Sequence, residues 1–209
     1  MWAALAPLLF AEITDWGQIE DPRGDCPIEE NDRRLEFHVP AGIHNLNPVI
    51  GDTSAPRVWR GVEGDFVIEA RVLDFPIPLE NTGLIRSSYV AAGLMVWQDD
   101  KNFLRWTRSA VGETKATFAS AEIYEQGKLA GGLTLPWNGE PMWLRLERRG
   151  DRIYLWLSSD GLKWRRHTSL RMPFLPQVKV GVFALNSTKK EFAASFSDFY
   201  LLESAAEVN

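Results

Sequence analysis

The 209-residue chain has few of the residues that cross-link a fold or bind metals: one cysteine, Cys26, and three histidines. A single thiol has no partner within the chain, so a framework of internal disulfides is excluded. His38, His44 and His167 show neither an H-x-H nor an H-x-x-x-H spacing, which disfavours a zinc site. No base lies near Cys26 in the sequence, so the sequence favours a packed structural cysteine over a nucleophile.

Long apolar runs and an excess of positive charge are also missing. No stretch approaches the ~20 consecutive apolar residues that cross a bilayer as a helix. The formal net charge of −5 gives no electrostatic footprint for nucleic acid or for an acidic membrane surface. Residues 1–12 form an apolar N-terminal segment that resembles part of a signal peptide but lacks the basic n-region. A segment that packs on the domain is the alternative, so a secreted or periplasmic location and a cytoplasmic one both stay open.

Short alternating runs separated by turn residues are the main pattern that is present. Apolar and polar residues alternate in residues 143–147 and again in residues 153–157. Gly150-Asp151 separates the two runs, and Asp160-Gly161 follows the second. This pattern predicts an antiparallel hairpin.

Similar runs along the chain predict about ten to twelve strands and no helix after the first dozen residues. The main candidates are residues 35–39, 58–62, 66–75, 91–97, 103–108, 115–124, 178–185 and 193–202. Residues 91–97 are nearly all apolar, which predicts a central strand buried on both faces. Residues 127–132 are predicted to be a break between strands. The long irregular segment 45–56 is of the kind that often carries binding residues.

The number and spacing of these strands predict the fold class: an all-β, two-sheet antiparallel jelly-roll sandwich. The length fits one domain, residues 13–203, followed by a short tail, residues 204–209. No internal repeat is visible, which disfavours a propeller.

The order of the landmarks along the chain carries a family resemblance. They are APR (55–57), VEGDF (62–66), AGLMVWQD (92–99), NF (102–103), WLRL (143–146), GD (150–151), SDG (159–161), Trp164, VKVGV (178–182) and FSDF (196–199). Together they resemble the concanavalin A-like lectin/glucanase superfamily, and more closely a poorly characterised branch of small jelly-roll domains loosely linked to enolase regulation. The similarity spans about residues 13–202. It implies two curved antiparallel sheets with a concave face that binds glycans in many relatives, although one fold hosts many activities.

A catalytic motif does not accompany this resemblance. Glycosidases of the superfamily carry Glu-x-Asp-x-x-Glu or a close variant on one strand, and this chain has no such run. The nearest pair is Glu122 and Glu125, which an extended strand would point to opposite faces. Cleavage of a glycosidic bond needs two carboxyl groups flanking one site, so a catalytic relative would have to assemble them from separate strands.

Sugar binding needs flat aromatic surfaces and planar polar groups, and several residues could supply them. The ligand-binding candidates are Trp97, Arg105, His44, Arg57, Asn186 and Glu122, with Trp106 and Trp137 as further aromatic rings. Gly93, Met95 and Trp97 share one strand face and could form a shallow groove floor. The alternative is that Met95 and Trp97 belong to the core. For His44 and Arg57 the alternative is a role in anchoring the irregular segment.

An acidic cluster near the N-terminus is the one candidate for a metal. It contains Asp21, Asp25, Glu29 and Glu30, and Asp198 lies near the other terminus. The resemblance implies structural calcium in many relatives, and oxygen ligands suit that ion. However, a compact D-x-D-x-D loop is missing, so a solvated acidic face is the favoured interpretation, and no cofactor is expected.

These observations favour a non-catalytic domain that binds carbohydrate or glycoconjugate on the concave sheet. The alternatives are a glycoside hydrolase with carboxylates from separate strands, and a structural or protein-interaction jelly roll.

Overall fold

A computed structural model shows a protein built almost entirely of strands. It describes residues 12–13, 16–31, 33–73, 75–137 and 141–203. The tail 204–209 and, apart from Glu12, the apolar segment 1–12 therefore lie outside the described residues. The described part contains sixteen strands and one 3-10 turn, η1 (Pro48–Ile50), and no helix in it is long and apolar enough to cross a bilayer.

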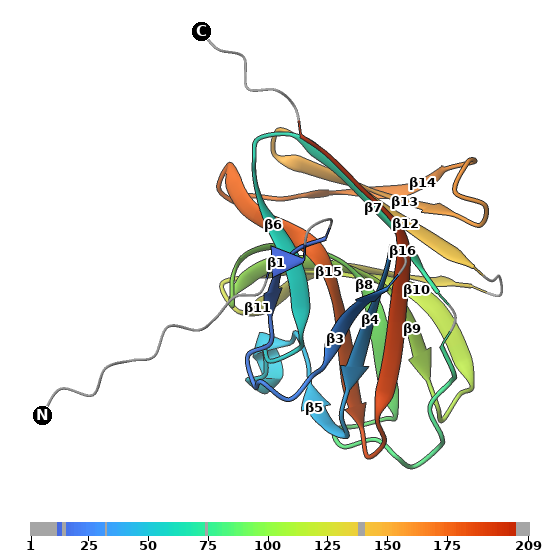
Figure 1. Cartoon of the computed structure of the whole chain (residues 1–209). Helices are drawn as coiled ribbons and strands as arrows, with labels where there is room; N and C mark the ends of the chain where they lie inside the picture. The colour runs from blue at the N-terminus through green and yellow to red at the C-terminus, as the bar shows by residue number, and fades with distance from the viewer. Residues whose placement is uncertain (1–11, 14–15, 32, 74, 138–140, 204–209) are drawn as a thin grey trace, which may run out of the picture.

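The larger of two sheets has nine strands, all paired antiparallel. Their order across the sheet is β1 (Glu12–Ile13), β2 (Gly17–Glu20), β6 (Arg57–Glu63), β15 (Gln177–Thr188), β8 (Tyr89–Asp99), β9 (Asn102–Val111), β10 (Ala116–Glu125) and β11 (Lys128–Pro136), with β5 (Gly42–His44) pairing with β15. Figure 1 shows β6, β15, β8 and β9 side by side.

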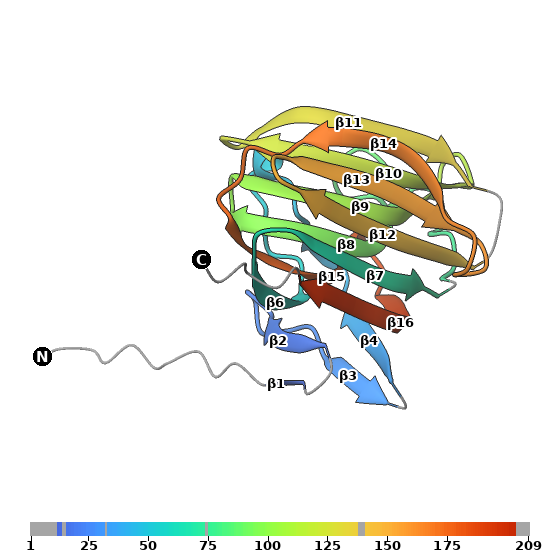
Figure 2. The ribbon, with the colours of Figure 1, turned by 90° about the horizontal axis from the view of Figure 1, so that it is seen from above.

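The second sheet has seven strands, again antiparallel. Their order is β14 (Arg165–Arg171), β13 (Arg152–Ser158), β12 (Met142–Arg149), β7 (Phe66–Val72), β16 (Phe192–Glu203), β4 (Arg34–Val39) and β3 (Ile28–Asn31). Seen from above in Figure 2, β14, β13, β12 and β7 form one layer over β10, β9 and β8. The predicted all-β, two-sheet antiparallel sandwich is confirmed.

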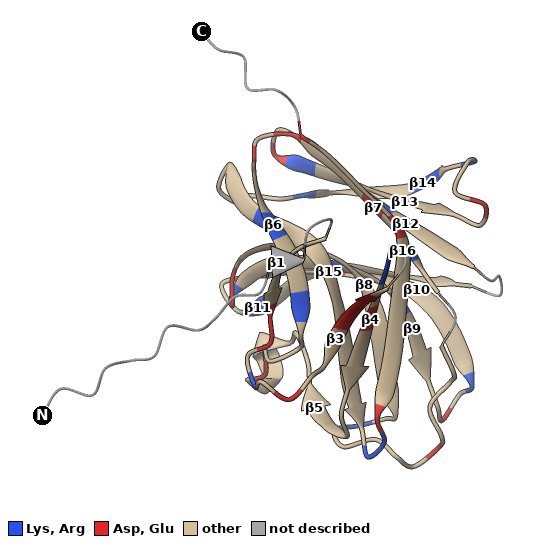
Figure 3. Cartoon of the chain, viewed as in Figure 1, with Lys and Arg blue, Asp and Glu red and all other residues tan. Residues whose placement is uncertain are grey.

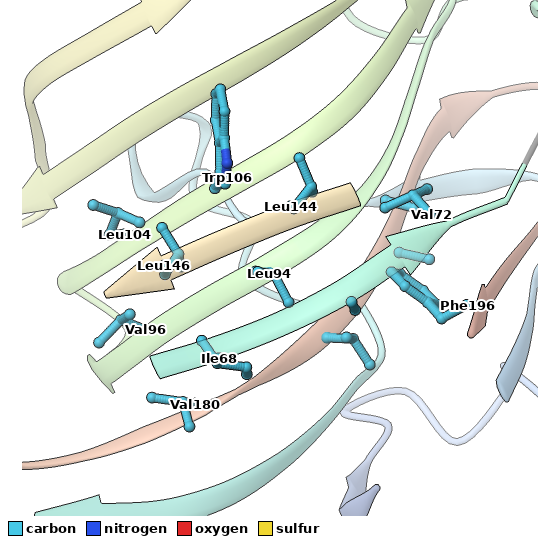
Figure 4. Close-up of a cluster of buried hydrophobic side chains, with 14 of the residues drawn as sticks. Ile68, Val72, Leu94, Val96, Leu104, Trp106, Leu144, Leu146, Val180 and Phe196 are labelled. Atoms are coloured by element: carbon cyan, nitrogen blue, oxygen red, sulfur yellow. The ribbon is translucent and has the colours of Figure 1, made fainter. Parts of the chain in front are cut away.

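The main hydrophobic core lies between the two sheets (Figure 4). On β7 and β12, Ile68 and Leu146 are direct cross-strand neighbours, and both are fully buried. Leu94 on β8 and Trp106 on β9 are paired in the same way in the other sheet. Every second residue of these strands points inward, because side chains alternate along a strand. The alternation that is visible in the sequence therefore produces the core.

The predicted hairpin is formed by β12 and β13. Leu144 pairs with Leu157 and Leu146 with Leu155. Gly150, at the tip, has φ +57°, a left-handed conformation that glycine adopts without strain. The prediction of an antiparallel hairpin in this stretch is confirmed, and β14 extends it to a third strand.

The break predicted at residues 127–132 is wrong. β11 begins at Lys128, and only Gln126 and Gly127, both with positive φ, form the turn. Glycines are tolerated in β11 because it is an edge strand with mostly exposed side chains, so a glycine there loses little packing. The short strands β1, β2, β3 and β5 were not predicted either, because two to four residues are too few to show a period of two.

The central strand β8 is buried on both faces, as predicted. Leu94 and Val96 point into the main core, whereas Met95 and Trp97 belong to a second apolar cluster on the opposite face. We call this opposite face, turned away from the seven-stranded sheet, the outer face. Met95 and Trp97 are thus buried core residues, as the alternative interpretation expected, although their cluster lies on the outer face and not between the two sheets.

Candidate functional site

The strand register places two rows of side chains across the outer face. One row runs through Gly61, Lys179, Trp97, Phe103 and Tyr124 on β6, β15, β8, β9 and β10. Residues directly opposite each other on neighbouring strands have their Cβ atoms about 5 Å apart, so each row is a line of contacts.

The second row consists of Trp59, Gly181, Met95, Arg105 and Glu122. The register thus brings Trp97, Arg105 and Glu122 to one face, as the groove hypothesis requires.

Aromatic rings and an arginine form a continuous stack along the first row. The Trp97 ring lies 4.6 Å from that of Phe103, which lies 4.8 Å from that of Tyr124. The guanidinium carbon of Arg57 lies 4.4 Å from the Trp97 ring centroid. Only 4% of Trp97 is exposed, so most of its ring surface contacts protein and little remains for a sugar.

The irregular segment 45–56 covers the middle of the outer face. Leu46 is fully buried in the apolar cluster of that face. Nη1 of Arg105 donates to the Leu46 carbonyl oxygen at 2.9 Å and to Oδ1 of Asn45 at 3.2 Å. Nδ2 of Asn45 donates to Oγ of Ser187 at 3.0 Å. This part of the face is therefore closed by the chain itself.

Arg105 also holds Glu122 at the side of the covered region. Its Nη2 and Nε donate to Oε2 of Glu122 at 2.6 and 3.1 Å, and the Tyr124 hydroxyl donates to the same oxygen. Burial lowers the pKa of Arg105, but the fields of Tyr89 and Glu122 outweigh burial and raise it above its ordinary value. All three donors reach Oε2, so Oε1 of this 27%-exposed carboxylate can accept from a ligand.

A second carboxylate, Glu20 on β2, organises the other end of the outer face. It accepts from Nη2 of Arg57 and, at 2.8 Å, from Nε1 of Trp59. Nζ of Lys179 lies 3.4 Å from Oε2 of Glu20 and 3.8 Å from the Trp59 ring centroid. Burial acts to raise the pKa of Glu20, but Arg57, Lys179 and Trp59 together bring it below its usual value.

Beside this carboxylate the outer face is open and hollowed. The hollow has a volume of about 560 Å³ and is lined by Trp59, Gly61, Val62, Glu63, Trp97, Gln98, Gln177, Val178, Lys179 and Glu203. A Cβ added at Gly61 would have no atom within 4 Å, so the floor is bare there. We call this hollow the open end. Ligand pockets commonly measure about 300–1,000 Å³, so it has the size for a sugar.

His44 and Asn186 lie away from the other candidates. They pair with each other on β5 and β15. Asn186 points to the same side of β15 as Val180 and Val182, which belong to the main core. Its amide nitrogen donates to the carbonyl oxygens of Val39, Pro40 and Lys190 at 3.3, 2.9 and 2.7 Å. Asn186 is fully buried, so this side chain joins the two sheets and has no surface to offer a ligand.

The other two aromatic candidates are also turned inward. Trp106 is fully buried in the main core, and its Nε1 donates to the carbonyl oxygen of Trp156 at 3.1 Å. Trp137 packs, partly buried, against the same core. Neither ring lines the open end.

The acidic residues considered for calcium do not form one site among the described residues. Asp21 holds a turn, accepting from the backbone N–H groups of Arg23 and Cys26 at 3.2 and 2.7 Å. Asp198 lies at a bulge of β16, on a different groove. The three metal-type side chains that do converge in the described part are Asp25, Cys26 and His44.

The groove on which Asp198 lies is strongly basic. It has a volume of about 590 Å³ and is lined by Trp16, Arg33, Arg34, Arg60, Arg71, Ser197, Asp198, Phe199, Tyr200 and Leu201. Figure 3 shows blue segments, which mark Lys and Arg, on β6, the strand that contains Arg60. Four arginines and one aspartate give this cavity, the arginine groove, a positive potential that suits an anionic group.

Sequence reasoning missed several residues of the open end: Trp59, Gly61, Gln98, Gln177 and Lys179. The alternation of Arg57, Trp59 and Gly61 along β6 is visible in the sequence. What the sequence does not show is that β15 lies between β6 and β8, which brings Trp59 and Lys179 beside Trp97.

Two antiparallel sheets packed face to face define an all-β jelly-roll sandwich protein, here with a partly covered outer face and an open, aromatic-lined end. The chain belongs to a family described as a protein of unknown function (DUF1349), which it matches over residues 50–204. No functionally curated protein matches the chain.

Solved structures with the same fold include proteins of several kinds. A functionally unknown protein from Saccharomyces cerevisiae has a TM-score of 0.73 at 17% identity, over 91% of this chain and 98% of that one. The GH43 protein BlXynB from Bacillus licheniformis (K247S mutant) has a TM-score of 0.68 at 16% identity. That alignment covers 94% of this chain, which spans only 38% of the length of BlXynB.

A legume lectin-like domain from Entamoeba histolytica is similar at a TM-score of 0.55 and 8% identity, over 86% of this chain and 88% of that one. At these identities the likeness establishes the fold alone. The suggested link to enolase regulation finds no counterpart among these proteins.

Proposed function

We propose that this protein is a non-catalytic domain that binds carbohydrate or glycoconjugate at the open end of its outer face. The observation that carries the proposal is the hollow between Trp59, Trp97 and Lys179, with the bare Gly61 as its floor. Structural neighbours with glycoside hydrolase and lectin-like titles support a carbohydrate-related role in general terms.

The lining of the open end has the chemistry that sugars need. Trp59 is half-buried and offers apolar ring surface to the C–H faces of a pyranose. Gln98, Gln177 and Glu63 supply amide and carboxylate groups that can bond to hydroxyls in fixed directions. Glu20 holds the Trp59 ring through Nε1, so the ring is positioned before any ligand arrives.

The two hydrogen-bonded carboxylates at the ends of the outer face, Glu20 and Glu122, are not placed as a catalytic pair. Glu20 on β2 and Glu122 on β10 are separated by five strand spacings of about 4.8 Å, or about 24 Å along the sheet. Glycosidases place their two carboxyl groups about 5–10 Å apart. A general acid also needs a raised pKa, whereas Arg57, Lys179 and Trp59 outweigh burial and lower the pKa of Glu20.

A glycan array followed by calorimetry tests the proposal. Xylo-, gluco- and manno-oligosaccharides and alginate fragments form the panel, and we expect binding of at least one of them. Gly61→Gln should weaken that binding by at least about tenfold, because a Cβ at this position meets no atom within 4 Å and the longer side chain would extend into the hollow. Trp59→Ala should weaken it as well, through loss of the ring surface.

The control is Leu162→Gln, a substitution of an 84%-exposed residue in the turn after β13, which should leave binding unchanged. Failure of the wild-type protein to bind any glycan would overturn the proposal. If Gly61→Gln bound the glycan as tightly as the wild type, the ligand would have to bind outside the open end. Turnover of a panel sugar that is lost in Glu122→Gln would favour the glycoside hydrolase alternative.

The arginine groove favours a second candidate, an acidic glycan with carboxylate or sulfate groups. Arg33 and Arg34 are exposed on its rim, and a buried Nε of Arg71 has no hydrogen-bond partner. Here Arg34→Glu should abolish binding of acidic glycans, while Gly61→Gln should not affect it. Arg165→Glu is the matched control, because Arg165 is likewise an exposed arginine and lies on β14. Equal loss in both arginine variants would indicate only a general charge effect.

A further inference from the structure

Asp25, Cys26 and His44 converge although they come from two separate parts of the chain. Asp25 and Cys26 lie in the loop between β2 and β3, whereas His44 ends β5. Nε2 of His44 lies 3.1 and 3.2 Å from the two carboxylate oxygens of Asp25. Sγ of Cys26 lies 3.3 Å from Oδ1 of the same aspartate. The three ligand atoms all lie within 4.8 Å of one another.

The two separations that involve Asp25 match edges of a tetrahedral metal site. Zinc binds nitrogen and carboxylate oxygen at about 2.0–2.1 Å and sulfur at about 2.3 Å. With tetrahedral angles, those bond lengths place nitrogen and oxygen about 3.3 Å apart, and sulfur and oxygen about 3.5 Å apart. The two observed distances to Asp25 are within a few tenths of an ångström of these values. The third edge, from His44 to Cys26, is no longer than 4.8 Å and would have to close to the tetrahedral separation when an ion binds.

We propose that Asp25, Cys26 and His44 form a mononuclear site for zinc or a similar borderline transition-metal ion, with water as the fourth ligand. Cys26 and His44 are buried, at 6% and 1% exposure. The side chain of Asp25 is 46% exposed, so solvent reaches the cluster from that side. One sulfur, one imidazole nitrogen and one carboxylate oxygen suit zinc, whereas calcium requires oxygen ligands throughout.

The surroundings of the thiol are consistent with a cation. Two carboxylates lie beside Cys26: its backbone N–H donates to Oδ2 of Asp21 at 2.7 Å, and its Sγ lies 3.3 Å from Oδ1 of Asp25. A bound divalent ion would place positive charge beside these carboxylates, and the thiol proton would pass to a water molecule as the sulfur–metal bond forms. Within the described part of the chain, the side chain of His44 makes its polar contact with Asp25 through Nε2, and its Nδ1 has no hydrogen-bond partner.

Such an ion would fasten the β2–β3 loop to the segment that covers the outer face. Segment 45–56 begins directly after His44, and the same loop already reaches it through Arg23, whose Nη2 lies 2.8 Å from Oδ2 of Asp52. Metal binding to the folded state alone stabilises that state by mass action. The expected consequence is a higher melting temperature and slower amide exchange in residues 45–56.

Zinc titration of the full chain, stripped with a chelator and carrying no histidine tag, tests this site. We expect one equivalent of Zn²⁺ by calorimetry, and a thiolate-to-metal charge-transfer band when Co²⁺ is used instead. Asp25→Asn should weaken Zn²⁺ binding by more than about tenfold, and Cys26→Ala should remove the Co²⁺ band. Because Asp25 is exposed, Asp25→Asn should fold as the wild type does, which circular dichroism checks.

The matched control is Asp198→Asn, which removes an exposed carboxylate outside the cluster and should leave Zn²⁺ binding unchanged. Absence of stoichiometric binding by the wild type would overturn the site. So would binding that Asp25→Asn and Cys26→Ala leave intact, since the ion would then lie elsewhere. The readouts are metal affinity and absorption, so they are independent of glycan binding.

Discussion

Glu20 is the residue on which the geometry of the open end most depends. Its carboxylate accepts from Arg57 and Trp59 and faces Lys179, three residues on two other strands. Arg57 is 3% exposed, so its guanidinium is a buried cation whose compensating charge is Glu20. Breaking a buried ion pair by removing one partner leaves an uncompensated charge, which destabilises a fold more than losing an exposed pair does.

Glu20→Gln should therefore lower the free energy of unfolding by about 2 kcal/mol near neutral pH. Burial acts to raise the pKa of Glu20, but Arg57, Lys179 and Trp59 lower it below the usual 4.5 in the folded state. The stabilisation is thus fully present above that value and is lost as pH falls through the lower folded pKa. Urea unfolding at about pH 7 and about pH 3 should show the gap between variant and wild type narrowing in acid.

Glu80→Gln is the control for this prediction, because Glu80 pairs with Lys115 on the surface, where both side chains are at least half exposed. It should change stability by less than about 0.5 kcal/mol at either pH. A gap for Glu20→Gln that stays constant between the two pH values would contradict the assigned role of the carboxylate.

At the scale of elements, segment 45–56 determines how much of the outer face a ligand can reach. It inserts Leu46 among Met95, Phe183 and Leu185 and is tied down by Arg105. The expected groove over Gly93, Met95 and Trp97 is filled by the protein's own side chains. The face that remains available is the neighbouring strip formed by β6 and β15.

Leu46→Ala should cost about 3 kcal/mol, because it removes a fully buried side chain and leaves a cavity over β8. Hydrogen exchange should show faster exchange of residues 45–56 than in the wild type, since the segment loses its apolar anchor. Val49→Ala, in the same segment but 64% exposed, should cost less than about 0.5 kcal/mol. Equal effects of the two substitutions would mean that Leu46 does not anchor the segment.

At the scale of the whole molecule, the two sheets share one core. Leu94 belongs to the nine-stranded sheet and Leu144 to the seven-stranded sheet, and both are fully buried in the same apolar cluster. A strand of one sheet loses contacts in this shared core when the other sheet is disturbed. We therefore expect the described domain to unfold as one cooperative unit.

Leu94→Ala and Leu144→Ala should each lower stability by about 3 kcal/mol and shift a single unfolding transition. Far-ultraviolet circular dichroism and tryptophan fluorescence, followed in the same denaturant series, should give coincident midpoints for the wild type and both variants. Separate midpoints for the two probes, in any of the three proteins, would show that the sheets unfold independently.

The alternation in the sequence determined the fold class, because side chains on a strand point in turn to opposite faces. The hairpin β12–β13, the doubly buried strand β8 and the two-layer sandwich all follow from that local pattern. The same rule places Gly93, Met95 and Trp97 together on one face. It fails for β11, where an exposed edge strand tolerates glycines.

Only the tertiary structure decided which residues meet, because strand order and loop paths connect positions far apart in the sequence. The position of β15 between β6 and β8 joins Lys179 to Trp59 and Trp97, while the path of segment 45–56 covers Arg105. The pairing of β5 with β15 turns Asn186 into a link between the sheets. The loop after β2 brings Asp25 and Cys26 close to His44, and the spacing of these residues along the chain does not predict this proximity.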